Sequence, residues 1–249
     1  MKKFSVTDIQ EVAKKLGLHH MSKAYFNLQD ESDERLQFLY ECLHKELILR
    51  EQKSRATKIG KAHLPSFKTL EEYDLNFQPQ LSKWQIQELN KLNWLKQKYN
   101  IIFMGSSGTG KTHLAVALGH LALSQNYKVF FSTLENLIYL LKTKEVFKSS
   151  SARVKYLYEC HLVIIDEVGY QKLDKQDVLL MYELVNKLYN KTSIIITTNI
   201  DFVKWGELFQ NENMVNAILD RLTHNCQIIN LKGESYRLLN HNNIFKKKN

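Results

Sequence analysis

Hydrophobic and polar positions beyond residue 80 divide the chain into two kinds of segment that alternate. Short runs of β-branched and apolar residues predict buried strands, and longer runs with apolar residues three or four positions apart predict amphipathic helices. The predicted strands are NIIFMG (100–105), KVFFST (128–133), LVIIDEV (162–168), SIIITTN (193–199) and CQIINL (226–231). Apolar strands that alternate with helices are typical of a parallel sheet covered on both faces, so we expect an α/β fold.

The first part of the chain shows helical spacing alone. Apolar residues recur at helical intervals in two groups: Ile9, Val12, Ala13 and Leu16, then Leu36, Leu39, Tyr40 and Leu43. The stretch QDESDE between these groups predicts a solvated turn before the second helix. The only two prolines, Pro65 and Pro79, disfavour helix at the ends of the stretch they enclose, which predicts a linker. We therefore expect a small helical domain at 1–64, a linker at 65–80, an α/β domain at 81–240 and a basic tail at 241–249.

Composition and targeting features are those of an ordinary globular protein. A chain of 249 residues can bury a substantial core and hold one large domain with a small appendage. Its three cysteines, Cys42, Cys160 and Cys226, are far apart and in no metal-type spacing, which predicts reduced thiols. The start, MKKFSVTDIQEV, lacks the apolar core of a signal peptide, and no apolar run approaches the ~18 residues of a membrane span. We therefore expect a cytoplasmic protein with no membrane partner.

A phosphate-binding motif follows the first predicted strand. The sequence GSSGTGKT fits G-x-x-x-x-G-K-[ST] without deviation, and it lies between a strand and a helix, as this motif requires. Glycines let such a loop curl so that its N–H groups and the positive end of the helix meet phosphate oxygens. In this motif Lys111 reaches the β- and γ-phosphates and the Thr112 hydroxyl binds Mg²⁺, which predicts a nucleoside triphosphate with Mg²⁺. The predicted contacts are Gly105, Ser106, Ser107, Gly108, Thr109, Gly110, Lys111 and Thr112.

Two acids, Asp166 and Glu167, come near the end of the third predicted strand. A carboxylate at the carboxyl end of a parallel strand, beside the phosphate loop, suits the metal, so we expect Asp166 to bind Mg²⁺ directly or through water. Glu167 is then placed to orient or activate a water molecule against the γ-phosphate, which favours hydrolysis over transfer to a small acceptor. The alternative is a pair of strand-end acids that face solvent.

Three polar residues farther along the chain have two interpretations each. Asn199 can hydrogen-bond the attacking water or the γ-phosphate if its strand lies between those of Lys111 and Asp166, or it can begin the next turn. Arg221, near the end of a predicted helix, can stabilise the γ-phosphate of a neighbouring subunit or interact with the dipole of its own helix. Arg237, in GESYRLL, is a weaker candidate for a nucleotide contact and can equally be a surface charge.

Together these segments resemble the AAA+ ATPases, and most closely the IstB-like transposition helper proteins of insertion sequences, with DnaC-like helicase loaders as near relatives. The resemblance includes LGLHHMSKAYFNL and HKELILREQKSRATKIGKAHLPSFKTLEEYDLNFQP, the phosphate-loop run GTGKTHLAVALGHLAL, and LVIIDEVGYQKLD. The run TTNIDFVKWGELFQNENMVNAILDRLTHNCQIINLKGESYRL is the most distinctive, because phosphate loops occur in very many proteins. Two departures, TTN where a serine often precedes the asparagine and THN where a second histidine is common, leave the hydrolytic residues intact.

The resemblance implies more than the motifs do. It implies ATP as the nucleotide and a phosphate-loop fold of the AAA+ type, with no full lid domain because the sequence stops shortly after GESYRLLN. Asn199 becomes a sensor-1 residue, Arg221 an arginine finger that acts on the adjacent subunit of a homo-oligomer, and Arg237 a sensor-2-like contact. His113, which follows the loop threonine in the family's form, joins the nucleotide-binding set. The expected catalytic residues are Lys111, Glu167, Asn199 and Arg221.

A basic stretch precedes the predicted linker. Between Lys45 and Lys61, helical spacing can align several lysines and arginines in one stripe or leave them on a solvated helix face. The net charge of +9 and the resemblance favour DNA binding. Such contacts address phosphates, so we expect little sequence preference and a steep dependence on salt. The candidate DNA contacts are Arg50, Lys53, Arg55, Lys58 and Lys61.

The sequence thus predicts an ATP-dependent helper of DNA transposition that assembles on duplex target DNA in its ATP state and recruits or stimulates a partner transposase. The alternative within the same class is a helicase loader that binds a replicative helicase and single-stranded DNA. A nucleoside or metabolite kinase would need an acceptor pocket and would have no evident use for Glu167 and Asn199. A binding module without hydrolysis is a further alternative, against which the Asp166–Glu167 pair speaks.

Overall fold

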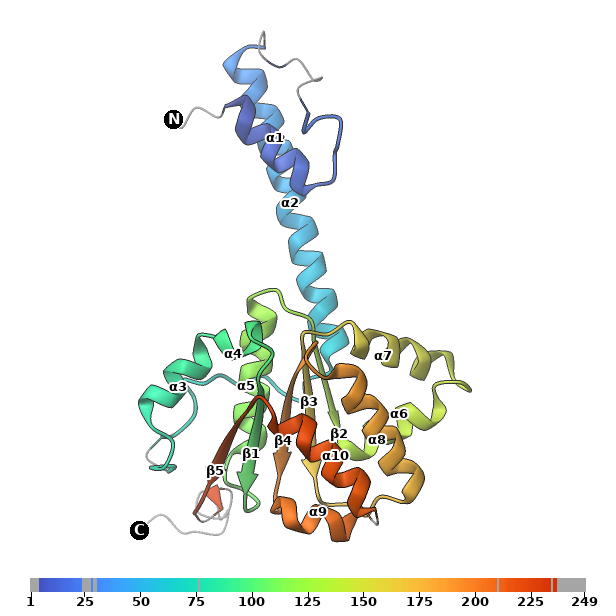
Figure 1. The fold of residues 1–249 in the computed structure, drawn as a ribbon. Coiled ribbons are helices and arrows are strands. Elements are labelled where there is room, and N and C mark those ends of the chain that lie inside the picture. Colours follow the sequence, from blue (N-terminus) through green and yellow to red (C-terminus); the bar gives the residue numbers. More distant parts are fainter. Residues whose placement is uncertain are drawn as a thin grey trace, which may run out of the picture. The chain divides into compact units, whose positions relative to one another are not determined.

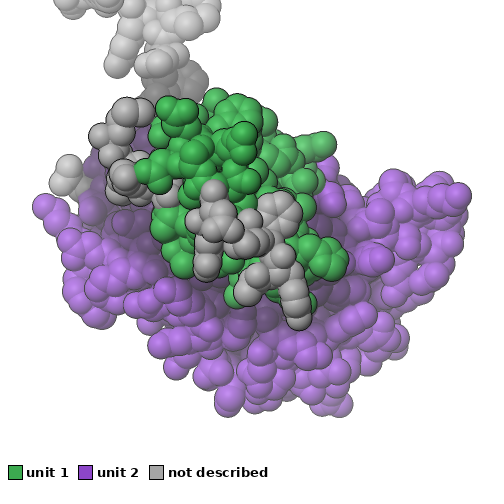
Figure 2. Space-filling view, turned by 90° about the horizontal axis from the view of Figure 1, so that it is seen from above, with its two compact units in different colours: residues 1–57 green, residues 58–249 purple. Residues whose placement is uncertain are grey.

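The structure, a computed structural model, describes residues 5–23, 28, 31–75, 77–209, 211–233 and 235–236 (Figure 1). The chain divides into two compact units, residues 1–57 and 58–249, which Figure 2 shows in different colours. We call them the N-terminal unit and the C-terminal unit. The division lies before the domain boundary expected at residue 64. The division rests on compactness alone, so the expected boundary between independently folding domains stays a prediction.

Among its described residues, the N-terminal unit contains the helices α1 (Val6–Lys15) and the greater part of α2 (Asp33–Ala62). Ser5 begins α1, because its hydroxyl accepts a hydrogen bond from the N–H of Asp8 at 3.3 Å and its own N–H donates to the Asp8 carboxylate at 2.8 Å. Both helices were predicted by the spacing of apolar residues. The buried apolar residues of this unit are Ile9, Val12, Ala13, Leu16, Leu28 and Leu36.

The C-terminal unit is built on a five-stranded parallel sheet with the strand order β2-β3-β4-β1-β5. The strands are β1 (Asn100–Gly105), β2 (Val129–Thr133), β3 (Leu162–Val168), β4 (Ser193–Thr198) and β5 (Cys226–Leu231). All five predicted strands are present, and all are parallel as expected. Because β4 lies between β1 and β3, the phosphate loop and the acidic strand end stand on either side of it.

Helices cover both faces of the sheet (Figure 1), as the apolar strands predicted. One face carries α3 (Lys83–Asn90), α4 (Asn93–Lys96) and α5 (Lys111–Ser124). The other carries α6 (Leu134–Thr143), α7 (Lys148–Tyr158), α8 (Lys175–Leu188), α9 (Phe202–Leu208) and α10 (Glu212–Thr223). No helix in the described part of the chain combines the length and apolarity that crossing a bilayer requires.

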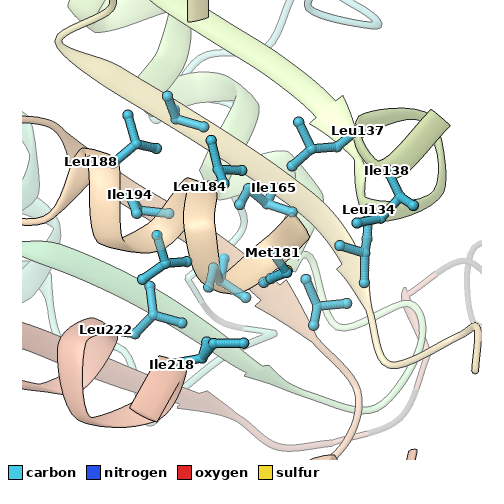
Figure 3. Packing of buried hydrophobic residues seen from close by; sticks show 14 of the residues in the cluster. Leu134, Leu137, Ile138, Ile165, Met181, Leu184, Leu188, Ile194, Ile218 and Leu222 are labelled. Atoms are coloured by element: carbon cyan, nitrogen blue, oxygen red, sulfur yellow. The ribbon is translucent and has the colours of Figure 1, made fainter. Parts of the chain in front are cut away.

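Each face of the sheet has its own apolar core. Successive residues of a strand point to opposite faces, so Ile101 packs in the core of α5 whereas Ile102 packs in the core of α6 to α10. Figure 3 shows the second core, where Leu134 of α6 and Met181 of α8 lie close to Ile165 of β3. These two cores fix the strands rigidly and so position the polar residues at the strand ends.

Residues 64–75, which we call the strap, lie mostly in the stretch predicted as a linker. The strap belongs to the C-terminal unit, and Leu70 is buried in the same core as α5. Two histidines of α5 contact its backbone: Nε2 of His113 is 3.0 Å from O of Thr69, and Nε2 of His120 is 2.7 Å from a second strap carbonyl. This differs from a linker that crosses solvent, because the strap buries an apolar side chain and pairs its carbonyls with a helix.

Candidate functional site

The phosphate loop connects β1 to α5 at the carboxyl edge of the sheet. Two of its glycines are required by geometry. Gly105 has φ +149°, and a Cβ atom there would lie 2.0 Å from the backbone oxygen of Leu231 in β5. Gly110 has φ +94°, and a Cβ atom there would lie 2.7 Å from Cε2 of Tyr73. Neither position has room for a side chain, so the loop is held tightly between β5 and the strap.

Lys111, the first residue of α5, has its ammonium group inside the loop. Its Nζ donates hydrogen bonds to O of Gly105 at 2.7 Å and to O of Ser106 at 2.6 Å, and the residue is only 7 % exposed. The Thr109 hydroxyl donates to the same Ser106 oxygen at 2.9 Å. A buried ammonium group is stabilised by anions, and the oxygens of a phosphate group are suitable partners at this position.

Asp166 is buried at the end of β3, beside the first turn of α5. The Thr112 hydroxyl lies 2.9 Å from Oδ1 and 3.2 Å from Oδ2 of this carboxylate. The Thr197 hydroxyl in β4 also donates a hydrogen bond to Oδ1. The structure therefore brings together the two residues predicted to bind Mg²⁺, and it adds Thr197, which the sequence analysis did not single out. The sequence offered only a weak signal for Thr197, its place two residues before Asn199 at a strand end.

Glu167 adopts a conformation that turns its side chain out of the strand. Its φ is +62°, in the left-handed region, and the pairing of β3 with β4 shifts register across this point. The N–H of Glu167 donates to the Thr197 hydroxyl at 3.0 Å, which fixes the bulge. Bulges of this kind commonly redirect a side chain beside an active site. The Glu167 side chain is exposed and lines the pocket described next.

A pocket of about 760 Å³ opens above the phosphate loop. That volume falls within the usual range for small-molecule sites, ~300–1,000 Å³. Its walls come from the loop, from the strap, and from Glu167, Tyr170, Thr197 and Tyr236. The N–H of Tyr236 donates to O of Gly108 at 3.1 Å, which links the chain beyond β5 to the loop. Lys111 and Glu167 thus both line a pocket of a size that can hold a small molecule.

The strap contributes Tyr73 to this pocket. The Tyr73 hydroxyl donates to O of Thr109 at 3.2 Å, and the Tyr73 ring meets the His113 ring edge-on with centroids 5.5 Å apart. Burial, with a smaller effect of Asp74, raises the pKa of Tyr73, so the hydroxyl keeps its proton and remains a donor. His113 was expected in the nucleotide-binding set, and the structure places it between the loop and the strap. No pattern in the sequence marks Tyr73, because its contacts lie far away along the chain.

Asn199 follows β4, the strand between those of Lys111 and Asp166, which meets the topological condition for a contact with water or γ-phosphate. It is exposed, and its Oδ1 lies 3.1 Å from the position that a Cβ atom on Gly169 would take. Among the described residues, the pocket walls include Thr197 but not Asn199. Its role therefore remains a proposal.

Arg221 lies at the opposite edge of the sheet from the phosphate loop. It stands in the last turns of α10, and it lines a small cleft with residues at the amino ends of the strands. Its guanidinium donates to Oδ1 of Asn186 at 3.1 Å and to O of Ala217 at 2.8 Å, and it lies 5.1 Å from the Tyr182 ring centroid. The structure does not bring Arg221 to the loop of its own chain. A contact with nucleotide therefore requires a second copy.

The remaining candidates divide between the two units. Arg50 in the N-terminal unit donates to Glu46 at 2.6 Å and to O of Leu16 at 3.2 Å, so its guanidinium already has two partners. Lys53 and Arg55 are exposed on α2. Lys58 and Lys61, also on α2, belong to the C-terminal unit. Arg237 and the basic tail lie outside the described residues.

Comparison with protein families matches residues 11–243 to the family described as IstB-like ATP binding protein. A protein of Bacillus thuringiensis subsp. berliner, named as an ATP-binding protein of insertion sequence IS232, is 36 % identical over 211 residues, which cover 85 % of this chain and 83 % of the relative. A Pseudomonas aeruginosa protein, named as an ATP-binding protein of insertion sequence IS21, is 34 % identical over 235 residues, 93 % of this chain and 89 % of the relative.

Solved structures show the same fold at low identity. DnaA from Aquifex aeolicus with bound AMPPCP has a TM-score of 0.56 and 20 % identity, over 68 % of this chain and 51 % of that one. DnaI has a TM-score of 0.56 and 15 % identity, over 66 % of this chain and 90 % of that one. The DnaC helicase loader has a TM-score of 0.50 and 19 % identity, over 69 % of this chain and 97 % of that one. The expected phosphate-loop fold of the AAA+ type is thereby confirmed.

Proposed function

Because the chain belongs to the family of IstB-like ATP-binding proteins, we propose that it is an ATP-dependent helper of DNA transposition. In this proposal the protein hydrolyses ATP, assembles on duplex target DNA while ATP is bound, and recruits or stimulates a partner transposase in the cytoplasm. The observation that carries it is the meeting of Lys111, Thr112, Asp166 and Glu167 at one edge of the sheet. The names of the relatives, which refer to insertion sequences, support the link to transposition.

The donor atoms at this edge fit Mg²⁺. The Thr112 hydroxyl oxygen lies 2.9 Å from Oδ1 and 3.2 Å from Oδ2 of Asp166. Hard oxygen ligands such as these are those that Mg²⁺ prefers. The described residues contain no group of three or more His, Cys, Asp or Glu side chains that could hold a metal ion. That suits Mg²⁺, which is usually held by one or two carboxylates together with substrate phosphates. Thr112 and Asp166 would hold the ion, which would supply positive charge beside the β- and γ-phosphates.

Glu167 is the proposed base in hydrolysis. Its carboxylate at the pocket wall would accept the proton of the attacking water, and Asn199 at the end of the neighbouring strand would orient that water. Lys111 would exchange its bonds to the loop carbonyls for bonds to phosphate oxygens and so stabilise the charge that develops there. Arg221 of a second copy would complete the site, because its own chain keeps it at the far edge of the sheet.

Two inactive variants, when mixed, test whether the site is shared between copies. Lys111→Ala removes the loop lysine and keeps Arg221, whereas Arg221→Ala keeps the loop and removes the arginine. We expect each variant alone to release little phosphate from ATP, and we expect the mixture to regain part of the activity, because some interfaces then combine an intact loop with an intact arginine. Arg221→Lys is the control for the lost packing on Tyr182. If the mixture were as inactive as each variant alone, the proposal that two copies share the ATP site would be wrong.

Sedimentation with DNA tests the assembly and its substrate. Glu167→Gln should form a large complex with duplex DNA when ATP is present, because ATP then persists at the interfaces. The unchanged protein should form the same complex more briefly. Preference for single-stranded over duplex DNA would instead favour the helicase-loader alternative. A chain that stays monomeric with every nucleotide and every DNA would refute assembly on DNA.

A further inference from the structure

The strands of the C-terminal unit begin at an edge that the nucleotide pocket of the same chain does not reach, and Arg221 also lies at this edge. At this amino edge, Val129 of β2 pairs with Leu162 of β3, and Leu162 pairs with Ser193 of β4. One residue earlier in each strand, Lys128, His161 and Thr192 therefore stand in one row across three neighbouring strands. Parallel pairing of β1 with β4 continues this row to the start of β1.

Lys98 closes the row on the side of β1. Lys98 lies immediately before Tyr99, which directly precedes β1, and it lines a small cleft together with Thr192. Because neighbouring strands lie ~4.8 Å apart, three spacings separate Lys128 from Lys98, about 14 Å in all. Two lysines distant in sequence thus mark the ends of one row.

Contacts around His161 hold the row in place. The N–H of Lys128 donates to Nδ1 of His161 at 3.1 Å, and the N–H of His161 donates to O of Lys128 at 2.9 Å. The ring of Tyr127 meets the His161 ring with centroids 5.4 Å apart. Because Nδ1 accepts a hydrogen bond from a backbone N–H, the imidazole is uncharged in this arrangement.

The last turns of α2 bring two further lysines to the same edge. Nζ of Lys58 donates to O of Asn126 at 2.9 Å, in the turn that leads into β2. Nζ of Lys61 lies 5.4 Å from the centroid of the Tyr156 ring in α7. Lys155, also in α7, is exposed beside it. We call these five lysines the amino-edge patch: Lys58, Lys61, Lys98, Lys128 and Lys155.

The charges in the amino-edge patch are mostly uncompensated. Within the described residues, Lys128 is the one lysine of the five that forms an ion pair, with Glu159 at 2.8 Å. That hydrogen bond and the charges of Lys128, Lys155 and Lys61 lower the pKa of Glu159. Burial, with the charges of Lys98, Lys128 and Lys58, lowers the pKa of His161. The contributions of the lysine charges to both shifts have the sign of a positive electrostatic potential at this edge.

We propose that the amino-edge patch binds the phosphate backbone of the duplex DNA on which the protein acts. Lysines are compact point charges without the fork that reads a base edge, so they suit phosphate contacts that are independent of sequence. The row of about 14 Å is comparable with the ~12 Å width of the major groove, whose two walls are phosphate backbones. The inference rests on the proposed function and adds the surface that makes the contact.

Of the basic stretch between Lys45 and Lys61, the proposed patch includes only the last two lysines, Lys58 and Lys61. Arg50 forms an ion pair with Glu46, which offsets its charge, whereas Lys58 is bonded to the uncharged oxygens of Asn126 and Lys61 lies near the Tyr156 ring. DNA at the amino edge and ATP at the carboxyl edge would occupy opposite ends of the same strands. DNA at the amino edge would therefore leave the nucleotide pocket of the same chain open.

Salt dependence of DNA binding measures the number of phosphate contacts. The triple variant Lys58→Gln, Lys98→Gln and Lys128→Gln removes three charges of the patch. The matched control, Lys83→Gln, Lys175→Gln and Lys204→Gln, removes three exposed lysines elsewhere in the same unit and has the same net charge. Binding of a labelled duplex of mixed sequence is measured with a non-hydrolysable ATP analogue over a series of salt concentrations. Thermal unfolding and ATP affinity of both variants show whether the fold is intact.

Each phosphate contact contributes ~0.9 to the slope of log affinity against log salt, so we expect the patch variant to lower that slope by about 2 to 3. The control should leave the slope unchanged, and lysine-to-arginine replacements at the three patch positions should retain it. Equal slopes in the patch variant and the control would overturn the assignment of the patch while leaving DNA binding in place. Loss of transposase binding with an unchanged slope would also overturn it, in favour of an acidic protein partner. Absence of any DNA binding by the unchanged protein would overturn the proposed function as well.

Discussion

The charged side chains at the two edges of one sheet differ in how deeply they are buried. At the carboxyl edge, Lys111 and Asp166 are buried and bonded to neighbouring groups. At the amino edge, Lys98 and Lys128 are half-buried and Lys155 is exposed. A buried polar group is fixed in position by its hydrogen bonds, so the first edge can hold a ligand of defined geometry. The more accessible lysines of the amino edge create a positive potential instead, which suits a long polyanion whose register does not matter.

The connections at each edge explain this difference. At the amino edge, helices lead into strands through short turns that contain a residue with positive φ, at Lys98, Asn126 and Asn190. Such turns close the backbone tightly and leave no large cavity. At the carboxyl edge, the phosphate loop and the turn after β3 leave room, and the strap and Tyr236 add walls. Ligands of open parallel sheets bind at the carboxyl ends of strands for this reason.

The largest expected effect comes from the carboxyl edge. Replacing Glu167 with glutamine removes a base while keeping its size, so we expect phosphate release to fall about 10²- to 10⁴-fold, with ATP binding retained. Glu159→Gln at the amino edge is the matched control and should leave the rate unchanged. Phosphate release is measured with excess ATP and Mg²⁺. A rate that Glu167→Gln does not lower would mean that another group activates the water.

Two lysine variants compare the edges directly. Lys111→Ala removes a charged hydrogen bond to phosphate, which is worth about 1.5–3 kcal/mol, so ATP should bind about 10- to 150-fold more weakly. Lys128→Ala at the amino edge should leave ATP affinity unchanged. Titration of a fluorescent ATP analogue gives both values. Equal effects of the two variants would show that ATP responds to the overall charge of the unit and not to a defined site.

Two glycines should respond to alanine with opposite signs. Gly110→Ala should destabilise the fold by about 1–2 kcal/mol or more, since its φ is +94° and the new Cβ meets the Tyr73 ring. Gly60 lies inside α2 with open space around its Cα, so Gly60→Ala should stabilise by about 0.5–1 kcal/mol. Chemical denaturation measures both.

The double variant Gly110→Ala with Tyr73→Ala separates the clash from the backbone strain. Because the alanine at residue 73 removes the ring, the two changes should be less harmful together than their sum by at least about 0.5 kcal/mol. Strict additivity would mean that the strap does not press on the loop.

The smallest effect is a dependence of stability on pH at the amino edge. The pKa of His161 is lower in the folded chain, so below its ordinary value of about 6.5 the unfolded chain binds more protons. Stability is therefore complete above that pH and is lost as pH falls through and below it. His161→Asn keeps an acceptor for the N–H of Lys128 and should flatten this part of the curve. His63, whose pKa is lowered by burial and by Arg153, would retain a dependence of the same sign. An unchanged curve in His161→Asn would contradict the expectation.

Features that depend on neighbours in the chain could be predicted from the sequence alone. The strands, the helices that alternate with them, the phosphate loop and the acids of β3 all follow from local periodicity or from a motif of fixed spacing. The meeting of Thr112 with Asp166 could also be anticipated, because parallel strands end at one edge and the motif assigns both residues to the metal. For Asn199 and Arg221 the residues alone left two interpretations each, and the resemblance favoured the catalytic one.

Tertiary structure alone decided the rest. Thr197 joins the network of Asp166 because β4 happens to lie between β1 and β3, and Tyr73 reaches the loop because the strap folds back onto α5. The row from Lys128 to Lys98 likewise exists only once the strands are ordered and in register. Such contacts join positions far apart in sequence, and no spacing along the chain encodes them. The sequence by itself determined the chemistry that each strand end carries, and the packing of the sheet determined which ends meet.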